Sequence, residues 1–163
     1  VLHRPDYATA HQMLGAALVD RGRLDEALRQ FSELARLRPD DAQARQMIGA
    51  IHAEQHRFEI ALLHFETALA LNSDDANIHY NLANALGHLG RRKDAIRHYR
   101  RAVELKPNDA DSRNNLGVML MQDGLMKEAA QQFIEVLRIR PEDRVAAANL
   151  RDAEAGIPRD NSQ

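Results

Sequence analysis

The feature of this sequence that most constrains its fold is a self-match at an interval of 34 residues. The segment from Asp74 to Pro107 matches the segment that ends at Pro141, and it matches twice more towards the N-terminus. Each copy holds two short amphipathic helical patterns with a turn between them. A unit of this kind cannot bury its apolar face alone, so the period predicts a stack of similar units in place of one globular core.

Four columns of residues keep the same register through the copies: a closing proline, a small residue, an aromatic ring and an aliphatic residue. Their members are Pro5, Pro39, Ser73, Pro107 and Pro141; Ala27, Ala61, Ala95 and Ala129; Phe31, Phe65, Tyr99 and Phe133; and Leu14, Ile48, Leu82, Leu116 and Leu150. In three units glycine follows the aliphatic residue, at Gly15, Gly49 and Gly117. Small residues in both helices of a unit predict that the two helices pack closely.

Together these columns resemble the tetratricopeptide repeat (TPR) family, and the resemblance covers nearly the whole chain. It implies an all-α, right-handed superhelical solenoid of antiparallel helix pairs. The units are then 8–41, 42–75, 76–109 and 110–143, followed by a capping helix at 144–156. Residues 1–7 are interpreted as the tail of a preceding repeat and 157–163 as a disordered polar tail, so we expect a fragment of a longer protein.

Periodicity and punctuation predict where the helices begin and end. First helices are expected near 7–21, 41–55, 75–89 and 109–123, and second helices near 24–37, 58–71, 92–105 and 126–139. The residues after the closing position are expected to cap the next helix: Asp6, Asp40, Asp74 and Asn108. The residues expected to seal one unit against the next are Leu37, Leu71, Leu105 and Ile139.

The turn inside each unit is expected to need a left-handed residue. Gly22, Gly90 and Gly124 stand there in three units, and glycine adopts that conformation without steric cost. His56 stands there in the second unit, where the same conformation costs about 1–2 kcal/mol. The sequence therefore predicts that the second turn is the least regular.

Composition limits the classes of partner. The formal charge is −2, whereas a protein that binds the phosphate backbone needs a basic surface. Cysteine is absent, which removes disulfides and thiolate metal ligands. Apolar runs stay short of the ~20 residues of a membrane span. We expect no cofactor, no nucleic-acid partner and no membrane insertion by this chain.

The resemblance implies that the second, fifth, sixth and ninth positions of the first helices face a concave groove. The candidate groove residues are Gln12, Met13, Gln46, Met47, Asn77, Tyr80, Asn81, Asn84, Asn114, Asn115 and Asn149. Positively charged residues are lacking at these positions. This argues against the TPR subtype that holds a C-terminal carboxylate with lysine and arginine.

Asparagine recurs at the sixth position, as Asn81, Asn115 and Asn149. A carboxamide offers an acceptor oxygen and a donor NH₂, so such a row suits the backbone of an extended peptide. The column resembles the asparagine ladder of the O-linked N-acetylglucosamine transferases, except that Met13 and Met47 occupy it in the first two units. The alternative is that these amides only solvate the inner face or bond to the adjacent helix.

Other residue clusters favour simpler interpretations. His52 and His56 are expected to be two exposed histidines at the end of one helix, without an evident third metal ligand. His64 and His98 are expected on a solvated outer face. The arginines that follow Gly90 are expected to form a charged outer face, with an anionic partner site as the alternative. A set of nucleophile, base and acid is not evident, so the chain is not expected to be an enzyme.

The sequence therefore predicts a non-catalytic scaffold that binds a protein or peptide partner in its groove. Two alternatives stay open: a substrate-recruiting arm of a larger enzyme such as a glycosyltransferase, and a scaffold that self-associates or contacts a polysaccharide. An amide-rich groove also suits sugar hydroxyls.

Overall fold

The computed structural model describes residues 5–157, and over this range the chain forms nine α-helices and no strand. The helices are α1 (Pro5–Asp20), α2 (Leu24–Leu37), α3 (Ala42–Glu54), α4 (Phe58–Leu71), α5 (Ala76–His88), α6 (Arg92–Leu105), α7 (Ala110–Gln122), α8 (Met126–Ile139) and α9 (Arg144–Gly156). They confirm the predicted helix pairs to within two residues at each end. Residues 158–163 of the predicted polar tail (157–163), and residues 1–4 of the predicted N-terminal tail (1–7), lie outside the described residues.

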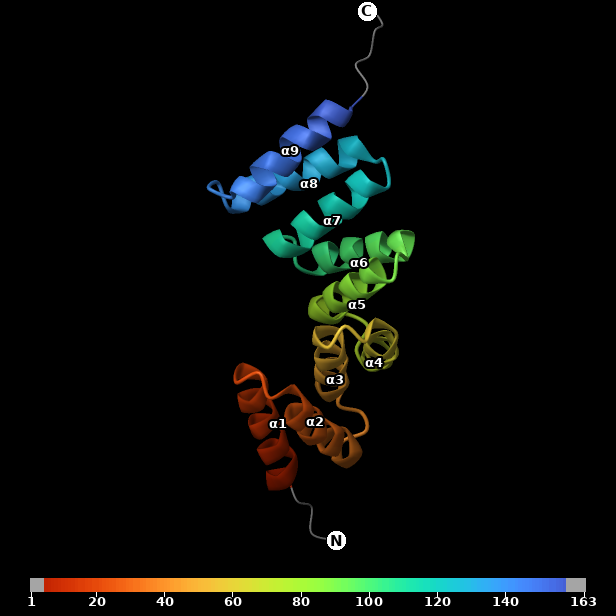
Figure 1. Ribbon diagram of the computed structural model, residues 1–163, viewed down its shortest axis with the longest axis vertical. Helices are drawn as coiled ribbons and strands as arrows, with labels where there is room; N and C mark the ends of the chain where they lie inside the picture. Colours follow the sequence, from red (N-terminus) through yellow and green to blue (C-terminus); the bar gives the residue numbers. More distant parts are fainter. Residues whose placement is uncertain (1–4, 158–163) are drawn as a thin grey trace, which may run out of the picture.

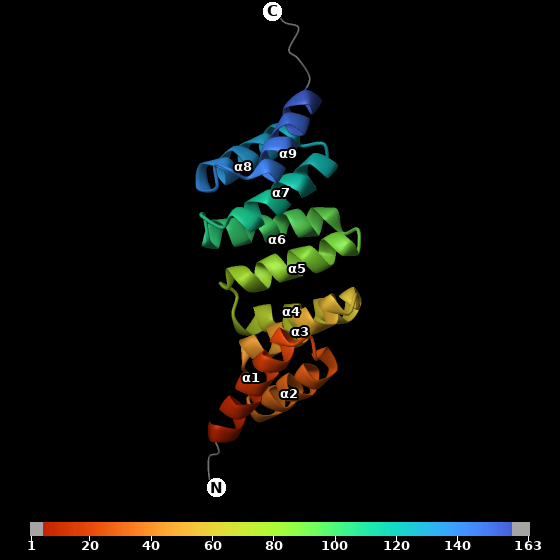
Figure 2. The ribbon, with the colours of Figure 1, turned by 60° about the vertical axis from the view of Figure 1, so that its left-hand side comes forward.

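The helices stack in chain order along the long axis of the molecule, with α1 at one end and α9 at the other (Figure 1). Each helix packs against the next one in the chain. Figure 2 shows the same succession of layers from a second direction. The odd-numbered helices, which are the first helices of each pair, also approach one another directly, as α3 approaches α5 and α7 approaches α9. They therefore form one continuous wall of the stack.

The core repeats with the sequence. The alanine column of the second helices is completely buried, and the aromatic column is buried beside it. In three units a glycine of the first helix makes room for that ring. A Cβ added at Gly117 would lie 2.6 Å from the nearest ring carbon of Phe133, and Gly15 and Gly49 face Phe31 and Phe65 in the same way. The small residues thus admit a ring from the partner helix.

The residues expected to seal one unit against the next are only partly buried. Leu37 and Leu71 are exposed, whereas Leu105 and Ile139 are half-buried, and Ile139 packs against Ala110, Val136 and Ala146. The residues three positions earlier are fully buried: Leu34, Ala68, Ala102 and Val136. Each second helix is therefore more deeply buried one turn before its last residue.

The helix caps also differ by one position from the expectation. Asp41, Asp75 and Asp143 are the N-cap residues, and each accepts a hydrogen bond from a backbone N–H of the first turn. Asp109 is the N-cap residue of α7, but its carboxylate accepts the hydroxyl hydrogen of Ser112 instead. Asp40, Asp74 and Asn108 lie one position too early, because the turn after the closing position is one residue longer than predicted. Asp6, the fourth expected cap, lies inside α1.

The left-handed turn residues are confirmed, with φ values of 69°, 72° and 80° at Gly22, Gly90 and Gly124 and 58° at His56. The prediction of an irregular second turn is wrong. The N–H of His56 bonds to the carbonyl of Ala53, and the N–H of Arg57 to that of His52, in the pattern of the glycine turns. The second unit therefore keeps the turn geometry and retains the steric cost of a side chain in it.

The contact between glycine and aromatic ring leads to a prediction about stability. Gly117→Ala should destabilise the fold by about 1–3 kcal/mol, because the new Cβ overpacks the site against the ring of Phe133. Gly87→Ala is the matched control, because its Cβ would meet the Met119 sulfur at an ordinary 3.6 Å. The control should be neutral or stabilising by up to ~1 kcal/mol. Urea denaturation measures both, and equal effects of the two substitutions would contradict the packing argument.

Candidate functional site: the wall of first helices

Side chains of the first helices bond to one another across neighbouring units. The amide nitrogen of Gln12 on α1 donates to the Oε1 atom of Gln43 on α3 at 3.1 Å. The amide nitrogen of Asn149 on α9 donates to the Oδ1 atom of Asn114 on α7 at 3.3 Å. These bonds place the polar side chains of different units on one shared surface.

The most connected group on this surface joins α5, α6 and α7. The Tyr99 hydroxyl donates to the Oδ1 atom of Asn84. Asn115 donates to the same oxygen at 3.3 Å and to the Tyr80 hydroxyl at 3.2 Å. Burial raises the pKa of Tyr99, and the neighbouring Tyr80 adds to the effect. The Tyr99 hydroxyl is therefore a proton donor at all physiological pH values, which fixes the direction of the network.

The three asparagines at the sixth position do not share one environment. Both amide hydrogens of Asn115 are used inside the protein, and Asn149 is bonded to Asn114. The side chain of Asn81 makes none of the hydrogen bonds found in the described residues and borders an open cavity. The alternative of bonding to the adjacent helix thus holds for two of the three, and Asn81 is the member whose whole amide faces outward.

The remaining candidate residues lie on α1, α3 and the start of α5. Met13 is 69% exposed, whereas Met47 is half-buried against the core of the first two units. Gln46 is half-buried. Asn77 is exposed at the start of α5 and accepts a hydrogen bond of 2.9 Å from Lys106. The structure thus concentrates the predicted groove residues on α5 and α7.

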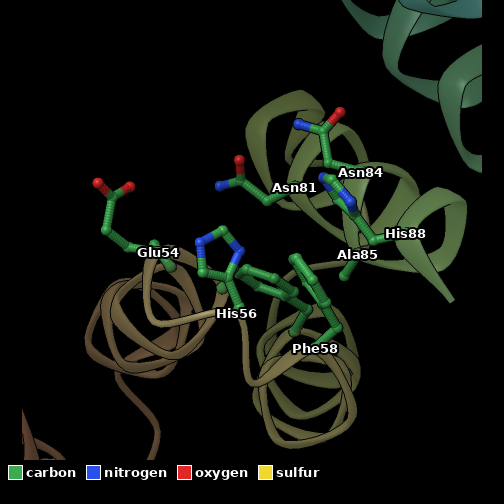
Figure 3. A pocket seen from close by; sticks show the side chains of 10 residues that line it. Glu54, His56, Phe58, Asn81, Asn84, Ala85 and His88 are labelled. Atoms are coloured by element: carbon green, nitrogen blue, oxygen red, sulfur yellow. The ribbon is translucent and has the colours of Figure 1, made fainter.

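A cavity of about 420 Å³ opens on this surface between α3 and α5 (Figure 3). Its apolar lining consists of Ala50, Ala53, Phe58, Phe65 and Ala85, and its polar lining of Glu54, His56, Asn81, Asn84 and His88. The rings of Phe58 and His88 are stacked with centroids 4.2 Å apart. The ring of His56 stands edge-on to Phe58 at 5.9 Å.

Sequence reasoning missed four of these lining residues: Glu54, His56, Phe58 and His88. They lie on three different helices and a turn. Glu54 and His88 share one register with Asp20 and Gln122, but the residue type changes from unit to unit, so a search for repeated residues could not find them. The sequence held one signal for this cavity. His56 is the one turn residue of the four units that is not glycine, and in the structure its ring lines the cavity.

The other histidines are less exposed than the sequence suggested. His98 is half-buried, and its Nδ1 atom lies 2.9 Å from Nδ1 of His79. The Nε2–H of His79 donates to the carbonyl of Ser73 at 3.1 Å, so His79 accepts and His98 donates when both rings are neutral. His52 is buried, not exposed, and stacks on His64 at 5.7 Å. Burial lowers the pKa of both His52 and His64.

The expected charged outer face is present around α6. Arg91 and Arg97 both pair with Asp94, and Arg100 pairs with Glu128. These pairs are exposed, so each contributes little to stability, and their two carboxylates neutralise only part of the basic region. Among the described residues no group of three or more His, Asp or Glu side chains is placed to hold a metal ion. None of the helices described combines the length and apolar character needed to cross a membrane.

The stacked helix pairs define a helical-repeat protein whose inner wall is polar. The family description "Tetratricopeptide repeat" matches residues 80–144, and "TPR repeat" matches residues 49–90. The chain belongs to the tetratricopeptide repeat family. No curated protein sequence is a significant match.

Solved structures share the fold. A MamA protein is similar with a TM-score of 0.85 and 20% identity, over 93% of this chain and 82% of that one. YrrB, described as a TPR protein with an unusual peptide-binding site, has a TM-score of 0.80 and 27% identity, over 89% and 75%. The O-GlcNAc transferase of Thermobaculum terrenum has a TM-score of 0.79 and 22% identity, over 85% of this chain and 27% of that one.

The histidine pair leads to a prediction about pH. Burial, with a smaller contribution from His79, lowers the pKa of His98 from 6.5 to about 4. The unfolded chain therefore binds a proton at His98 before the folded chain does, and stability should fall as the pH drops from 6.5 to 4. His98→Gln should remove this part of the pH dependence. Glutamine already stands in the same register at Gln30, where it bonds to His11 at 2.8 Å.

Chemical denaturation at several pH values measures the slope for both proteins. Since Gln30 shows that the register accepts glutamine, the variant is expected to fold. An NMR titration of the His98 ring gives its pKa directly, and a value near 6.5 in the folded protein would contradict the prediction.

Proposed function

We propose that this chain is a non-catalytic protein-interaction module that holds an extended segment of a partner along the wall of first helices. The observation that carries the proposal is the row of carboxamide and phenol groups on α5, α7 and α9. These groups bond to one another across units and still present polar atoms outward.

The arrangement suits a peptide backbone better than a globular partner. Asn81 offers a complete amide, and the side-chain Oδ1 atom of Asn115 accepts none of the side-chain hydrogen bonds found in the described residues. A peptide group needs one acceptor and one donor from its receptor, which one carboxamide supplies. The similarity to YrrB, whose structure is described by its peptide-binding site, supports the same use of the fold.

The expected affinity is modest. Each net hydrogen bond contributes ~0.5–1.5 kcal/mol, and ordering a flexible segment offsets part of the total. A micromolar dissociation constant corresponds to a binding free energy of about −8 kcal/mol. A few amide contacts reach that value only when apolar side chains of the bound segment are also buried. Tyr80 and the half-buried Met47 are the anchors that this surface offers.

A peptide ligand selected from a displayed random library tests the proposal. Asn81→Ala should weaken its binding about 2- to 10-fold, which corresponds to the loss of one hydrogen bond. The fold should not change, because Asn81 makes no internal hydrogen bond in the described residues. Gln131→Ala, at an exposed position of α8, is the control and should bind normally. Calorimetry measures both, and unchanged affinity of the Asn81 variant would exclude this contact.

Asn115→Ala is a less direct probe. It removes two internal hydrogen bonds, to Tyr80 and Asn84, and so is expected to lower stability as well as affinity. A melting curve therefore has to accompany any binding measurement on it.

Self-association is a second candidate, and one observation favours it. Leu14 on α1 is 50% exposed, whereas the same register is almost fully buried at Ile48, Leu82 and Leu116 by the preceding second helix. Ala10 and Ala17 are exposed on the same face of α1. This exposed apolar face is suited to pack against another amphipathic helix.

If a second copy uses this face, Leu14→Glu should shift the sedimentation of the protein towards the monomer. Leu63→Glu is the control, because Leu63 is 62% exposed on α4 and outside this face. A wild-type protein that is monomeric at high concentration would contradict self-association through α1.

A recruiting arm of a larger enzyme is the third candidate. Its support is the likeness to the O-GlcNAc transferase structure, of which this chain spans 27%. The proposed groove contact is the same in both cases, since such an arm would hold its substrate by the same amides.

A further inference from the structure

The cavity between α3 and α5 has two kinds of lining that point to a particular ligand. One part of the lining is apolar, formed by Ala50, Ala53, Phe65 and Ala85. The other part, here called the rim, is polar and includes Glu54, His56, Asn81 and His88 (Figure 3). A ligand that fills it needs an apolar stem and a head group with several hydrogen-bonding atoms.

The polar groups of the rim are not used inside the protein. Among the described residues, Glu54 forms none of the ion pairs, and neither Asn81 nor the rings of His56 and His88 take part in a hydrogen bond. The two imidazole rings are held in place by packing instead, because His88 stacks on Phe58 and His56 stands against the edge of the same ring. Unpaired polar groups around one opening are the arrangement expected of a binding site.

The rim also departs from the repeat. Where His56 stands, the other three units have glycine, and the backbone of His56 has a φ of 58°. Residue 58 corresponds to Leu24, Arg92 and Met126. Residues 54 and 88 share one register with Asp20 and Gln122, and all four differ in type. Stacking of the units therefore does not require these side chains. Strain that the fold does not need is a reason to look for a function at that point.

The charges of the rim select among ligand classes. Glu54 is its one carboxylate, and neither Lys nor Arg lines the cavity. An anionic group would face that carboxylate unpaired, and a purely apolar group would cover polar atoms without bonding them. A cationic head group pairs with Glu54 and donates to the amide oxygen of Asn81 and to imidazole nitrogens.

Of the two basic side chains, arginine fits this lining better than lysine. Its planar guanidinium has five donors, binds a carboxylate in a bidentate manner and packs against aromatic rings. Its three methylene groups suit an apolar interior. The ammonium group of lysine is compact and strongly hydrated, so it uses fewer of the acceptors that surround the opening.

We propose that this cavity is an arginine subsite of the groove, in which Glu54 pairs with the guanidinium and Asn81 and the two histidines complete its hydrogen bonds. The inference deepens the proposed function, because it names one side chain that the bound segment should carry. The segment would then run past α3 and α5 with an arginine directed into the cavity.

The test uses Nα-acetyl-arginine amide, with Nα-acetyl-lysine amide and Nα-acetyl-norleucine amide as comparison ligands. Each is titrated into the ¹⁵N-labelled protein and followed by amide shifts in NMR spectra. The arginine compound should give saturable shifts at residues 54, 81 and 88. It should bind at least fivefold more tightly than either comparison ligand.

Two variants decide whether Glu54 carries the recognition. Glu54→Gln should weaken binding of the arginine compound at least fivefold, and its folding is not at risk because Glu54 is exposed and unpaired. Asp20→Asn removes the same charge in the same register of the first unit and should change nothing. Equal binding of the norleucine or lysine compound, or an unaffected Glu54→Gln variant, would overturn the arginine assignment.

The result is separable from the proposed function. If a library-selected peptide binds through Asn81 while the arginine compound does not bind, the groove function stands and the subsite is wrong. If the arginine compound binds as described while no peptide is held along the wall, the subsite stands and the groove function is wrong.

Discussion

The structure depends on one contact, that between the aromatic ring of each second helix and a small residue in the first helix of the same unit. A ring such as Phe65 or Phe133 lies where a Cβ atom on the facing glycine would be under 3 Å away. This contact limits how closely the two helices approach. The fully buried alanine beside the ring allows the same close approach, because its side chain is small. Because this kind of packing recurs from unit to unit, the units stack in a line and their first helices form a continuous wall.

The third unit shows how a small change in this contact alters the wall. Here Ala83 takes the place of glycine, and Tyr99 takes the place of phenylalanine. The added hydroxyl bonds to Asn84, and the same oxygen of Asn84 then accepts from Asn115 of the next unit. A substitution in the core therefore fixes the orientation of two amides on the surface. The polar network of the wall is strongest beside the unit whose core ring carries an oxygen atom.

Much of the fold could be predicted from the sequence, because the period multiplies every weak signal. One Gly or Pro is ambiguous, but Gly22, Gly90 and Gly124 in one register leave little freedom for the turn. The period could not show how deeply each side chain is buried. Leu37 and Leu34 both suit a buried helix face, and only the packing of the next unit shows that Leu34 is the buried one. Similarly, contacts between His79 and His98 depend on how two helices face each other, which sequence spacing does not reveal.

The candidate site was predictable only where it follows the repeat. Equal spacing identified the asparagine column, yet the three members differ because each unit has different neighbours: Asn115 faces Tyr80, Asn149 faces Asn114, and Asn81 faces a cavity. A repeated residue thus shows where on the wall a side chain lies, but not which hydrogen bonds it makes. Residues that differ from the repeat indicate positions with a role other than stacking. Stacking explains the columns, so it cannot explain why His56 occupies a glycine position or why Glu54 and His88 stand beside it. In a solenoid the repeated residues are sufficient for the fold. Specificity for a partner therefore has to come from the residues that differ between units.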